Sequence, residues 1–256
     1  MYFCGMNYNE RNAHARDRRL HFDAPTHTYY VDRESDGSQF VCESVTTIVE
    51  GLFEQFDADY WAARKATPEH PAEAIKAEWE AKARRASALG TELHDRVERY
   101  YLGEKPSPEA CADRAFGNFL RFASVHRLVP FRSEWRIFSE RYRVAGTLDF
   151  LAGERGRFEL WDWKRSSKVV SPEGEPICEG FRGKCGVKAA VAHIPDTSYW
   201  HYALQLSLYR YILETEYDIP TAVARLGVFH PDYGCPWVVE VPYLRREAKA
   251  ILDSRL

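Results

Sequence analysis

Two aspartates and a lysine lie close together in the sequence and could perform chemistry as a group. Asp149 precedes a predicted hairpin turn at 153–156, and Asp162 and Lys164 follow it. If the turn occupies those positions, Asp149 faces Leu160 across the hairpin, and Asp162 lies one diagonal step away on the same face of the sheet. Because the side chains of a strand alternate between its faces, Lys164 shares that face. The sequence therefore predicts a compact group of two carboxylates and one ammonium.

Such a group is suited to binding a divalent cation and to handling phosphate. Two carboxylates this close repel each other, which raises a pKa unless a cation lies between them. Mg²⁺ and Mn²⁺ prefer oxygen ligands, and they keep several waters and bind substrate phosphate as well. Lys164 could orient or activate an attacking water, or it could stabilise the negative charge that builds up on the phosphate.

The alternative is an exposed strand face with an ordinary ion pair, since a D-x-K triplet often occurs by chance. The apolar residues around the group weaken this alternative. They alternate with the charged residues along the strands, and their side chains lie on the face expected to meet the core. These residues are Leu148, Phe150, Trp161 and Trp163. Rigid strands would then hold the group in place, as a catalytic site requires.

The first half of the chain is expected to supply a hairpin and helices. Residues rich in β-formers at 26–33 and 39–43 predict the hairpin. Ser44 and Asp57 are suitable N-caps for the first two helices, and Gly90 predicts a bend or a break in the third. The predicted helices span 45–53, 57–65, 71–101 and 109–126.

The second half has the composition of a sheet with a few helices. Strands are predicted at 133–142, 144–152, 157–163, 223–229 and 236–241, and helices at 199–217 and 244–256. The stretch 165–197 contains no regular pattern, and a loop of that length is usually functional or mobile. We therefore expect an α/β or α+β fold: a mixed central sheet flanked by helices and preceded by an N-terminal helical lobe.

Composition and charge limit the class of protein. With 256 residues, 45% of them hydrophobic and 29% charged, the chain is typical of a folded globular domain. Its 35 Lys and Arg against 38 Asp and Glu give a net charge of −3, which excludes a histone-like binder but not a local basic groove. We expect a single domain over 1–256, with the hairpin and helical lobe in 1–130 and the sheet core in 131–256.

The sequence gives no sign of membrane insertion or export. It has no run of about eighteen apolar residues, and its first twenty residues lack the apolar segment of a signal peptide. The six cysteines, at positions 4, 42, 111, 178, 185 and 235, include no C-x-x-C pair. We therefore expect reduced thiols and a cytoplasmic location.

Three further motifs lie on neighbouring elements. His94 follows Gly90 on a predicted helix, where without other context it would be a polar residue half packed against nearby tyrosines. Glu134 opens the strand before the hairpin, although an exposed strand glutamate would also look like this. Gln205 and Tyr209 lie one helical turn apart on one helix face, and they could equally be helix surface and helix core.

Taken in order, these motifs resemble those of the PD-(D/E)XK nucleases of the RecB type. The series G-x-x-x-H, Glu134, G-x-x-D, D-x-K and Q-x-x-x-Y runs from Gly90 to Tyr209, nearly half of the chain. This group includes the nuclease domain of RecB, the CRISPR-associated exonucleases and the mitochondrial genome maintenance exonuclease. The resemblance implies a restriction-endonuclease-like core.

The resemblance also implies a site for Mg²⁺ or Mn²⁺. Its ligands would be the side chains of His94, Asp149 and Asp162 and the main-chain carbonyl of Trp163. Lys164 would be the catalytic lysine beside the two aspartates, and Glu134 an auxiliary acid near a second metal position. Some relatives hold a four-iron four-sulfur cluster on closely spaced cysteines. The cysteines here lack that spacing, so we expect no such cluster.

DNA is the implied substrate. Gln205 and Tyr209 would line the site, contacting DNA or steadying the lysine, while Arg165 and Lys168 would help to hold phosphates. We expect a deoxyribonuclease, and specifically an exonuclease acting at DNA ends in repair, recombination or phage DNA processing, with a recombination protein as a candidate partner. Two alternatives stay open: a non-catalytic DNA-binding subunit of a recombination complex, and an RNA endonuclease on the same fold.

Overall fold

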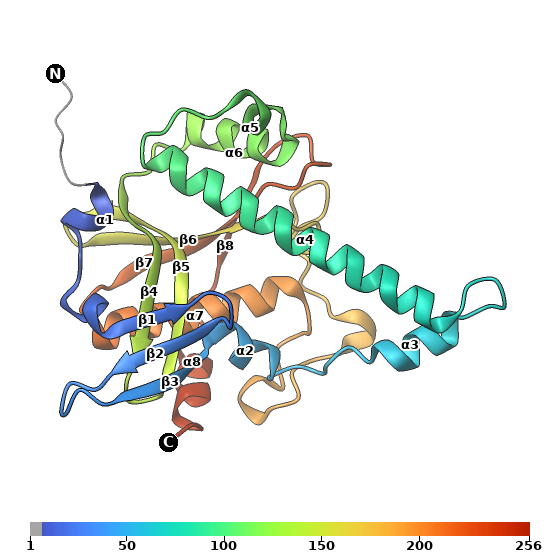
Figure 1. Cartoon of the computed structure of the whole chain (residues 1–256), viewed down its shortest axis with the longest axis horizontal. Helices are drawn as coiled ribbons and strands as arrows, with labels where there is room; N and C mark the ends of the chain where they lie inside the picture. Colours follow the sequence, from blue (N-terminus) through green and yellow to red (C-terminus); the bar gives the residue numbers. More distant parts are fainter. Residues whose placement is uncertain (1–6) are drawn as a thin grey trace.

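An eight-stranded mixed sheet forms the centre of the computed structural model, which describes residues 7–256 (Figure 1). The strand order is β1-β2-β3-β5-β6-β7-β8, and β4 pairs with β5 beside this path. The strands are β1 Leu20–Asp23, β2 Thr28–Asp32, β3 Gln39–Ser44, β4 Pro130–Ser139, β5 Val144–Glu154, β6 Arg157–Lys164, β7 Thr221–Val228 and β8 Trp237–Val241. The expected class, a mixed sheet flanked by helices, is confirmed.

Eight α-helices accompany the described strands. They are α1 Tyr8–Arg11, α2 Val45–Glu50, α3 Ala58–Lys65, α4 Ala72–Tyr101, α5 Pro108–Ala112, α6 Arg114–Val125, α7 Ser198–Glu216 and α8 Arg245–Asp253. Short 3-10 turns occur at η1 Ala15–Arg19, η2 Phe181–Gly183 and η3 Ala189–Val191. The sequence patterns did not reveal α1, η1 or β1.

The predicted N-terminal hairpin is present and belongs to the main sheet. β2 and β3 pair antiparallel, and β3 joins the rest of the sheet by pairing in parallel with the start of β5. The two predicted caps are confirmed. Ser44 Oγ accepts a hydrogen bond from the N–H of Thr47 at 3.0 Å, and Asp57 Oδ1 accepts one from the N–H of Tyr60 at 2.8 Å.

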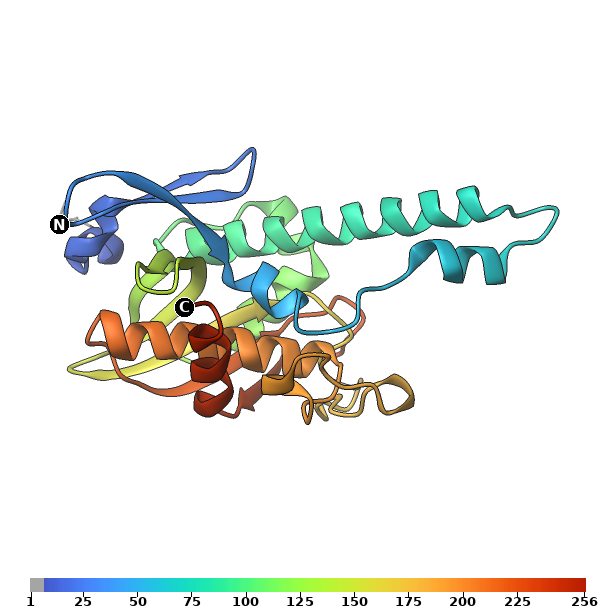
Figure 2. The same cartoon turned by 90° about the horizontal axis from the view of Figure 1, so that it is seen from below.

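Two expectations about the helices were wrong. α4 runs through Gly90 without a break and is straight in Figures 1 and 2, because one glycine in a helix costs only about 1 kcal/mol and its neighbours strongly favour helix. The helix expected at 109–126 is two helices that meet at Asp113. This residue ends α5 and caps α6, its Oδ1 accepting a hydrogen bond from the N–H of Phe116 at 2.8 Å.

The register of the β5–β6 hairpin differs from the prediction by two residues. Leu151, not Asp149, lies opposite Leu160. The turn consists only of Arg155 and Gly156, both at positive φ, rather than the whole of 153–156. Such a two-residue turn matches the twist of the strands, so the strands continue to Glu154 on one side and Arg157 on the other.

Helices cover both faces of the sheet (Figure 2). On one face, α2, α7 and α8 pack a cluster that includes Leu148 and Leu160. On the other, α4 and α6 pack an aromatic cluster. Its aromatic members are Phe116, Phe119, Phe122, Phe150, Trp161, Trp163 and Phe229. Leu148 was expected beside Phe150 on one face of the sheet but packs on the opposite face. The regular alternation of side chains along β5 is therefore interrupted between these two residues.

The stretch 165–197 contains no strand or α-helix, as expected, and it leads directly from the end of β6 to α7. Cys42, Cys111, Cys178, Cys185 and Cys235 are free thiols, and Cys4 lies outside the described residues. Within 7–256, no helix combines the length and the apolar character needed to cross a membrane.

Candidate metal centre and adjoining cleft

The candidate site lies where β5 separates from β6 while it stays paired with β4. β5 pairs with β3 only at its first two residues, and its ladder with β6 ends at Phe150 opposite Trp161. Asp149 follows immediately beyond that last pair. Its Oδ2 accepts a hydrogen bond from the N–H of Trp163 at 2.7 Å. The carboxylate therefore accepts a hydrogen bond from a backbone N–H that has no partner in the β5–β6 ladder, because the two strands separate here.

Glu134 lies opposite Asp149 on the other edge of β5. The ladder has Ser133 opposite Phe150 and Trp135 opposite Leu148, so Glu134 is level with Asp149. Its φ is +44°, a conformation that a glutamate adopts rarely and at a cost of about 1–3 kcal/mol. Strain of this kind inside a strand is a common mark of a functional position.

His94 approaches these carboxylates from α4. Its Nε2 is 2.8 Å from the carbonyl oxygen of Trp163, which orients the ring and turns Nδ1 toward the carboxylates. Nδ1 lies 3.7 Å from Glu134 Oε1 and 3.6 Å from Asp149 Oδ2. Among residues 7–256, His94, Glu134 and Asp149 form a group whose ligand atoms all lie within 4.8 Å of one another.

The charges in this group change the pKa of His94. Burial acts to lower the pKa, but the carboxylates of Asp149 and Glu134 outweigh it and raise the pKa to about 9. In the metal-free protein at neutral pH, the imidazole is therefore protonated and neutralises part of the negative charge. A divalent cation bound here would take the place of that proton.

Asp162 and Lys164 form a second pair beside the group. Lys164 Nζ lies 2.6 Å from Asp162 Oδ2, and Gln205 Nε2 donates a hydrogen bond to Asp162 Oδ1 at 3.3 Å. The ammonium also lies 4.2 Å from the ring centre of Tyr202. Only 2% of the Asp162 side chain and 14% of the Lys164 side chain are exposed. The two residues share a face as predicted, but they form a buried ion pair rather than an exposed one.

Burial and mutual attraction both act on this pair. Burial raises the pKa of Asp162, and the neighbouring Lys164 opposes that rise. For Lys164, burial favours the neutral amine, but the attraction of Asp162 and Asp149 is stronger and raises the pKa. Lys164 therefore stays protonated at neutral pH. Although Asp162 Oδ2 is in contact with Nζ, it accepts no well-directed hydrogen bond, so a lone pair stays available.

Tyr209 supports the strand that carries Asp149. Its ring and hydroxyl lie so close to Gly146 that a Cβ there would be 2.6 Å from Cε1 and from the hydroxyl oxygen. Tyr209 is buried, as is Gln205. Neither side chain lines the adjoining cleft, so of the two predicted roles their positions fit support of the site rather than contact with DNA.

A cleft of about 690 Å³ opens beside His94 and Lys164. α4 forms one wall, and the end of β6 with the residues after it forms another. Basic side chains in its lining are Lys82, Lys164, Arg165 and Lys168, and no Asp or Glu of residues 7–256 lines it. Figure 2 shows α4 extending beyond the sheet, with α3 packed against its far end. Arg165 and Lys168, which the sequence analysis expected to hold phosphates, both line this cleft.

The residues of the group fit a divalent metal ion. One imidazole nitrogen and two carboxylate oxygens are donors that Mn²⁺ accepts and that Mg²⁺ accepts with water completing its shell. Of the predicted ligands, His94 and Asp149 converge. Trp163 O instead holds the ring of His94, and Asp162 lies outside the 4.8 Å group. Glu134, expected near a second metal position, is in the same group as His94 and Asp149.

Sequence reasoning did not identify the contact of Tyr202 with Lys164. The sequence analysis did not include Tyr202 in the site, but its ring lies against the Lys164 ammonium. Its spacing from Gln205 and Tyr209 places all three on one face of α7 and could have revealed it. Lys82 lies on the same continuous helix as His94 and lines the cleft with it.

Comparisons with known proteins do not assign a family. No family model matches the sequence, and no curated protein matches it. Among solved structures, a crystal structure of SSO0001 matches with a TM-score of 0.34 and 14% identity, covering 84% of this chain and 76% of that one. A likeness at this level carries no conclusion about function.

Proposed function

We propose that this protein is a metal-dependent deoxyribonuclease, an exonuclease of the RecB-type PD-(D/E)XK group. The observation that carries the proposal is the meeting of His94, Glu134 and Asp149 beside Lys164 at one end of a cationic cleft. The order of the sequence motifs along the chain supports the same group. Neither feature alone would distinguish a nuclease from another metal-binding protein.

The chain would hold Mg²⁺ or Mn²⁺ through His94 Nδ1 and the carboxylates of Glu134 and Asp149, with Asp162 close by. Such an ion supplies a water of lowered pKa and neutralises charge on a scissile phosphate. Trp163 contributes indirectly, because its carbonyl holds the ring of His94 and its N–H holds the carboxylate of Asp149. Partners of this kind fix the orientation of ligands.

Lys164 would stabilise charge rather than remove a proton. Its raised pKa keeps it protonated, and it lines the cleft, so its N–H groups can donate to a phosphate oxygen. Asp162 holds the ammonium in place, and Gln205 in turn holds Asp162. The face of Tyr202 gives the ammonium a second favourable contact.

The cleft would bind the DNA backbone. Lys82, Arg165 and Lys168 line the cleft together with Lys164, and no Asp or Glu of the described residues lines it. Because contacts between phosphates and cations release counterions, the affinity should fall steeply with salt. A local basic cleft of this kind is compatible with a net charge of −3 for the whole chain.

The test is cleavage of linear and circular DNA, single- and double-stranded, with an RNA substrate in parallel. With Mg²⁺ or Mn²⁺ we expect linear DNA to be degraded and circular DNA to survive, and EDTA should stop the reaction. Asp149→Asn and Lys164→Ala should each lower the rate by about 100-fold or more. Lys249→Ala, on the exposed surface of α8, is the matched control and should cut normally.

Each alternative has its own outcome in this experiment. Salt-sensitive DNA binding without metal-dependent products would replace the proposal with a non-catalytic DNA-binding subunit. Preferential cleavage of RNA would replace it with an RNA endonuclease. Cutting of closed circles would retain the metal chemistry but overturn the assignment as an exonuclease.

A further inference from the structure

The residues beside Glu134 on β4 are held by an N-terminal segment, which we define as residues 7–19. Asp17 contacts two of them. Its Oδ1 accepts a hydrogen bond from Trp135 Nε1 at 2.8 Å, and its Oδ2 accepts one from Arg132 Nη1 at 2.7 Å. Arg132 Nη1 also donates to the carbonyl oxygen of Asn12 at 3.0 Å. One carboxylate of the N-terminal segment thus links residues on either side of Glu134.

Ser133, the immediate neighbour of Glu134, is held by two other residues of the segment. Its N–H donates to Asn9 Oδ1 at 2.8 Å. Its hydroxyl oxygen accepts hydrogen bonds from Tyr8 Oη at 2.9 Å and from Asn9 Nδ2 at 3.1 Å. Both Tyr8 and Ser133 are buried, so the contact between them is shielded from water.

The same serine connects β4 to α4. Ser133 Oγ donates its proton to Glu98 Oε1 at 3.0 Å, and Glu98 lies one helical turn after His94. With two hydrogen bonds accepted and one donated, the hydroxyl can form no further hydrogen bond. The segment therefore acts at the point where the strand that carries Glu134 meets the helix that carries His94.

We propose that the N-terminal segment is a positioning element of the metal centre: Tyr8, Asn9 and Asp17 hold Glu134 in its left-handed conformation and at its distance from His94. The inference rests on the proposed metal site, and it assigns a task to residues that touch neither metal nor substrate. Glu134 has a conformation that a glutamate adopts rarely and at a cost, so contacts of the surrounding structure are needed to hold it.

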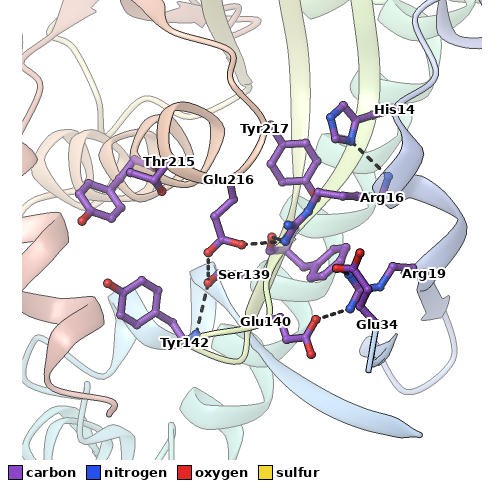
Figure 3. Close-up of polar contacts among 12 residues, drawn as sticks. His14, Arg16, Arg19, Glu34, Ser139, Glu140, Tyr142, Thr215, Glu216 and Tyr217 are labelled. Carbon is purple, nitrogen blue, oxygen red and sulfur yellow. Dashed lines mark hydrogen bonds and ion pairs between the residues drawn. The ribbon is translucent and has the colours of Figure 1, made fainter. Parts of the chain in front are cut away.

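The other end of the segment serves as an internal control. Figure 3 shows Arg16 and Arg19 of η1 against Glu216, Ser139 and Glu140. Arg19 pairs with Glu140 and Glu34 and donates to the carbonyl oxygen of Asp32 at 2.8 Å. None of these contacts of Arg19 involves Ser133, Trp135 or Glu98. Removing Arg19 therefore loosens the same segment without touching the contacts beside Glu134.

The experiment is a titration of the metal-free full chain with Mn²⁺ alone, in which free Mn²⁺ is measured by electron paramagnetic resonance. The variants are Asn9→Ala, Tyr8→Phe and Arg19→Ala, with Asp149→Asn as the ligand control, at a temperature where circular dichroism shows each to be folded. We expect Asn9→Ala to weaken Mn²⁺ binding by about 10-fold, the lower end of the effect of losing a direct partner of a metal ligand, because Asn9 holds the neighbour of Glu134 rather than Glu134 itself. Tyr8→Phe, which removes one hydroxyl, should weaken it less, and Arg19→Ala should leave it within about twofold.

The outcomes separate this inference from the proposed function. If Asn9→Ala and Tyr8→Phe bind Mn²⁺ like the unaltered chain while Asp149→Asn does not, the positioning role is wrong and the metal site stands. If Arg19→Ala weakens binding as much as Asn9→Ala, general loosening explains the effect and the inference also fails. If Asp149→Asn binds normally, the metal site itself is wrong. Should Asn9→Ala not fold, Tyr8→Phe decides.

Discussion

Asp149 performs two tasks with one carboxylate. Its Oδ2 accepts the N–H of Trp163 and also faces His94 Nδ1, so it ties the end of β6 to the helix that brings the imidazole. Glu134 completes the group from a backbone position with a positive φ. The chemistry of the site thus depends on two local irregularities: a β5–β6 ladder that ends at Phe150, just before Asp149, and a strained residue level with Asp149 on β4.

Metal affinity should depend on pH through His94. The fold raises the pKa of this histidine from 6.5 to about 9. Protonation of His94 therefore stabilises the metal-free fold in full below pH 6.5, and this contribution is lost as the pH rises through 9. The same proton competes with metal. We expect the apparent affinity for Mn²⁺, followed by calorimetry, to rise about tenfold per pH unit between 7 and 9. His94→Gln should bind more weakly and without this slope; an equal slope in that variant would assign the effect to another group.

Gly146 should not tolerate a side chain. A methyl group there would overlap the ring of Tyr209, so Gly146→Ala should lower the free energy of unfolding by about 1–3 kcal/mol and weaken Mn²⁺ binding at nearby Asp149. Gly117→Ala is the matched control. Gly117 lies inside α6 with open space around it, so alanine should raise stability by up to about 1 kcal/mol. Urea denaturation measures both; a neutral Gly146→Ala would show that Tyr209 is free to move.

At the scale of elements, the sequence predicted the helix caps and the strands that short-range interactions determine. The caps at Ser44 and Asp57 and the strands from 133 onward follow from propensity and side-chain hydrogen bonds. The register of the β5–β6 hairpin could not be predicted from these signals, because it depends on whether the turn contains two residues or four. Both glycines of the turn region have positive φ, yet only Gly156 belongs to the turn.

The two glycines of the hairpin should respond differently to substitution. A Cβ on Gly153 would lie 2.0 Å from the carbonyl oxygen of Arg157, and its φ is +132°. Gly153→Ala should therefore lower the free energy of unfolding by about 2 kcal/mol or more. Gly156 has φ +79° with nothing near its missing Cβ, and asparagine tolerates that region, so Gly156→Asn should cost less than about 1 kcal/mol. Thermal unfolding of both variants checks the register; equal losses would favour the longer turn.

At the scale of the whole molecule, the site could be predicted only in part. His94 and Asp149 were placed together because the order of motifs implied it. The convergence of Glu134 on the same group depends on strain that no residue type reveals. The contacts of Tyr8 with Ser133, 125 positions away in the sequence, leave no local signal at all. Long-range packing, rather than propensity, supplies these parts of the site.

The basic lining of the cleft predicts how DNA affinity depends on salt concentration. If Lys82 and Arg165 contact phosphates, Lys82→Ala and Arg165→Ala should each weaken DNA binding on all sequences alike and reduce the slope of log affinity against log salt by about 1. Arg245→Ala, on α8 and outside the cleft, should leave the slope unchanged. Fluorescence anisotropy across a salt series measures this. Slopes that stay the same in the cleft variants would place the DNA elsewhere.

The central claim is that His94, Glu134 and Asp149 hold one divalent cation. Anomalous diffraction from a crystal soaked in Mn²⁺ tests it most directly, because the signal locates the ion without reference to activity. The account predicts a peak among His94 Nδ1 and the carboxylates of Glu134 and Asp149, and its loss in Asp149→Asn. A soaked crystal with no peak at these three residues, or with the ion bound elsewhere, would contradict it.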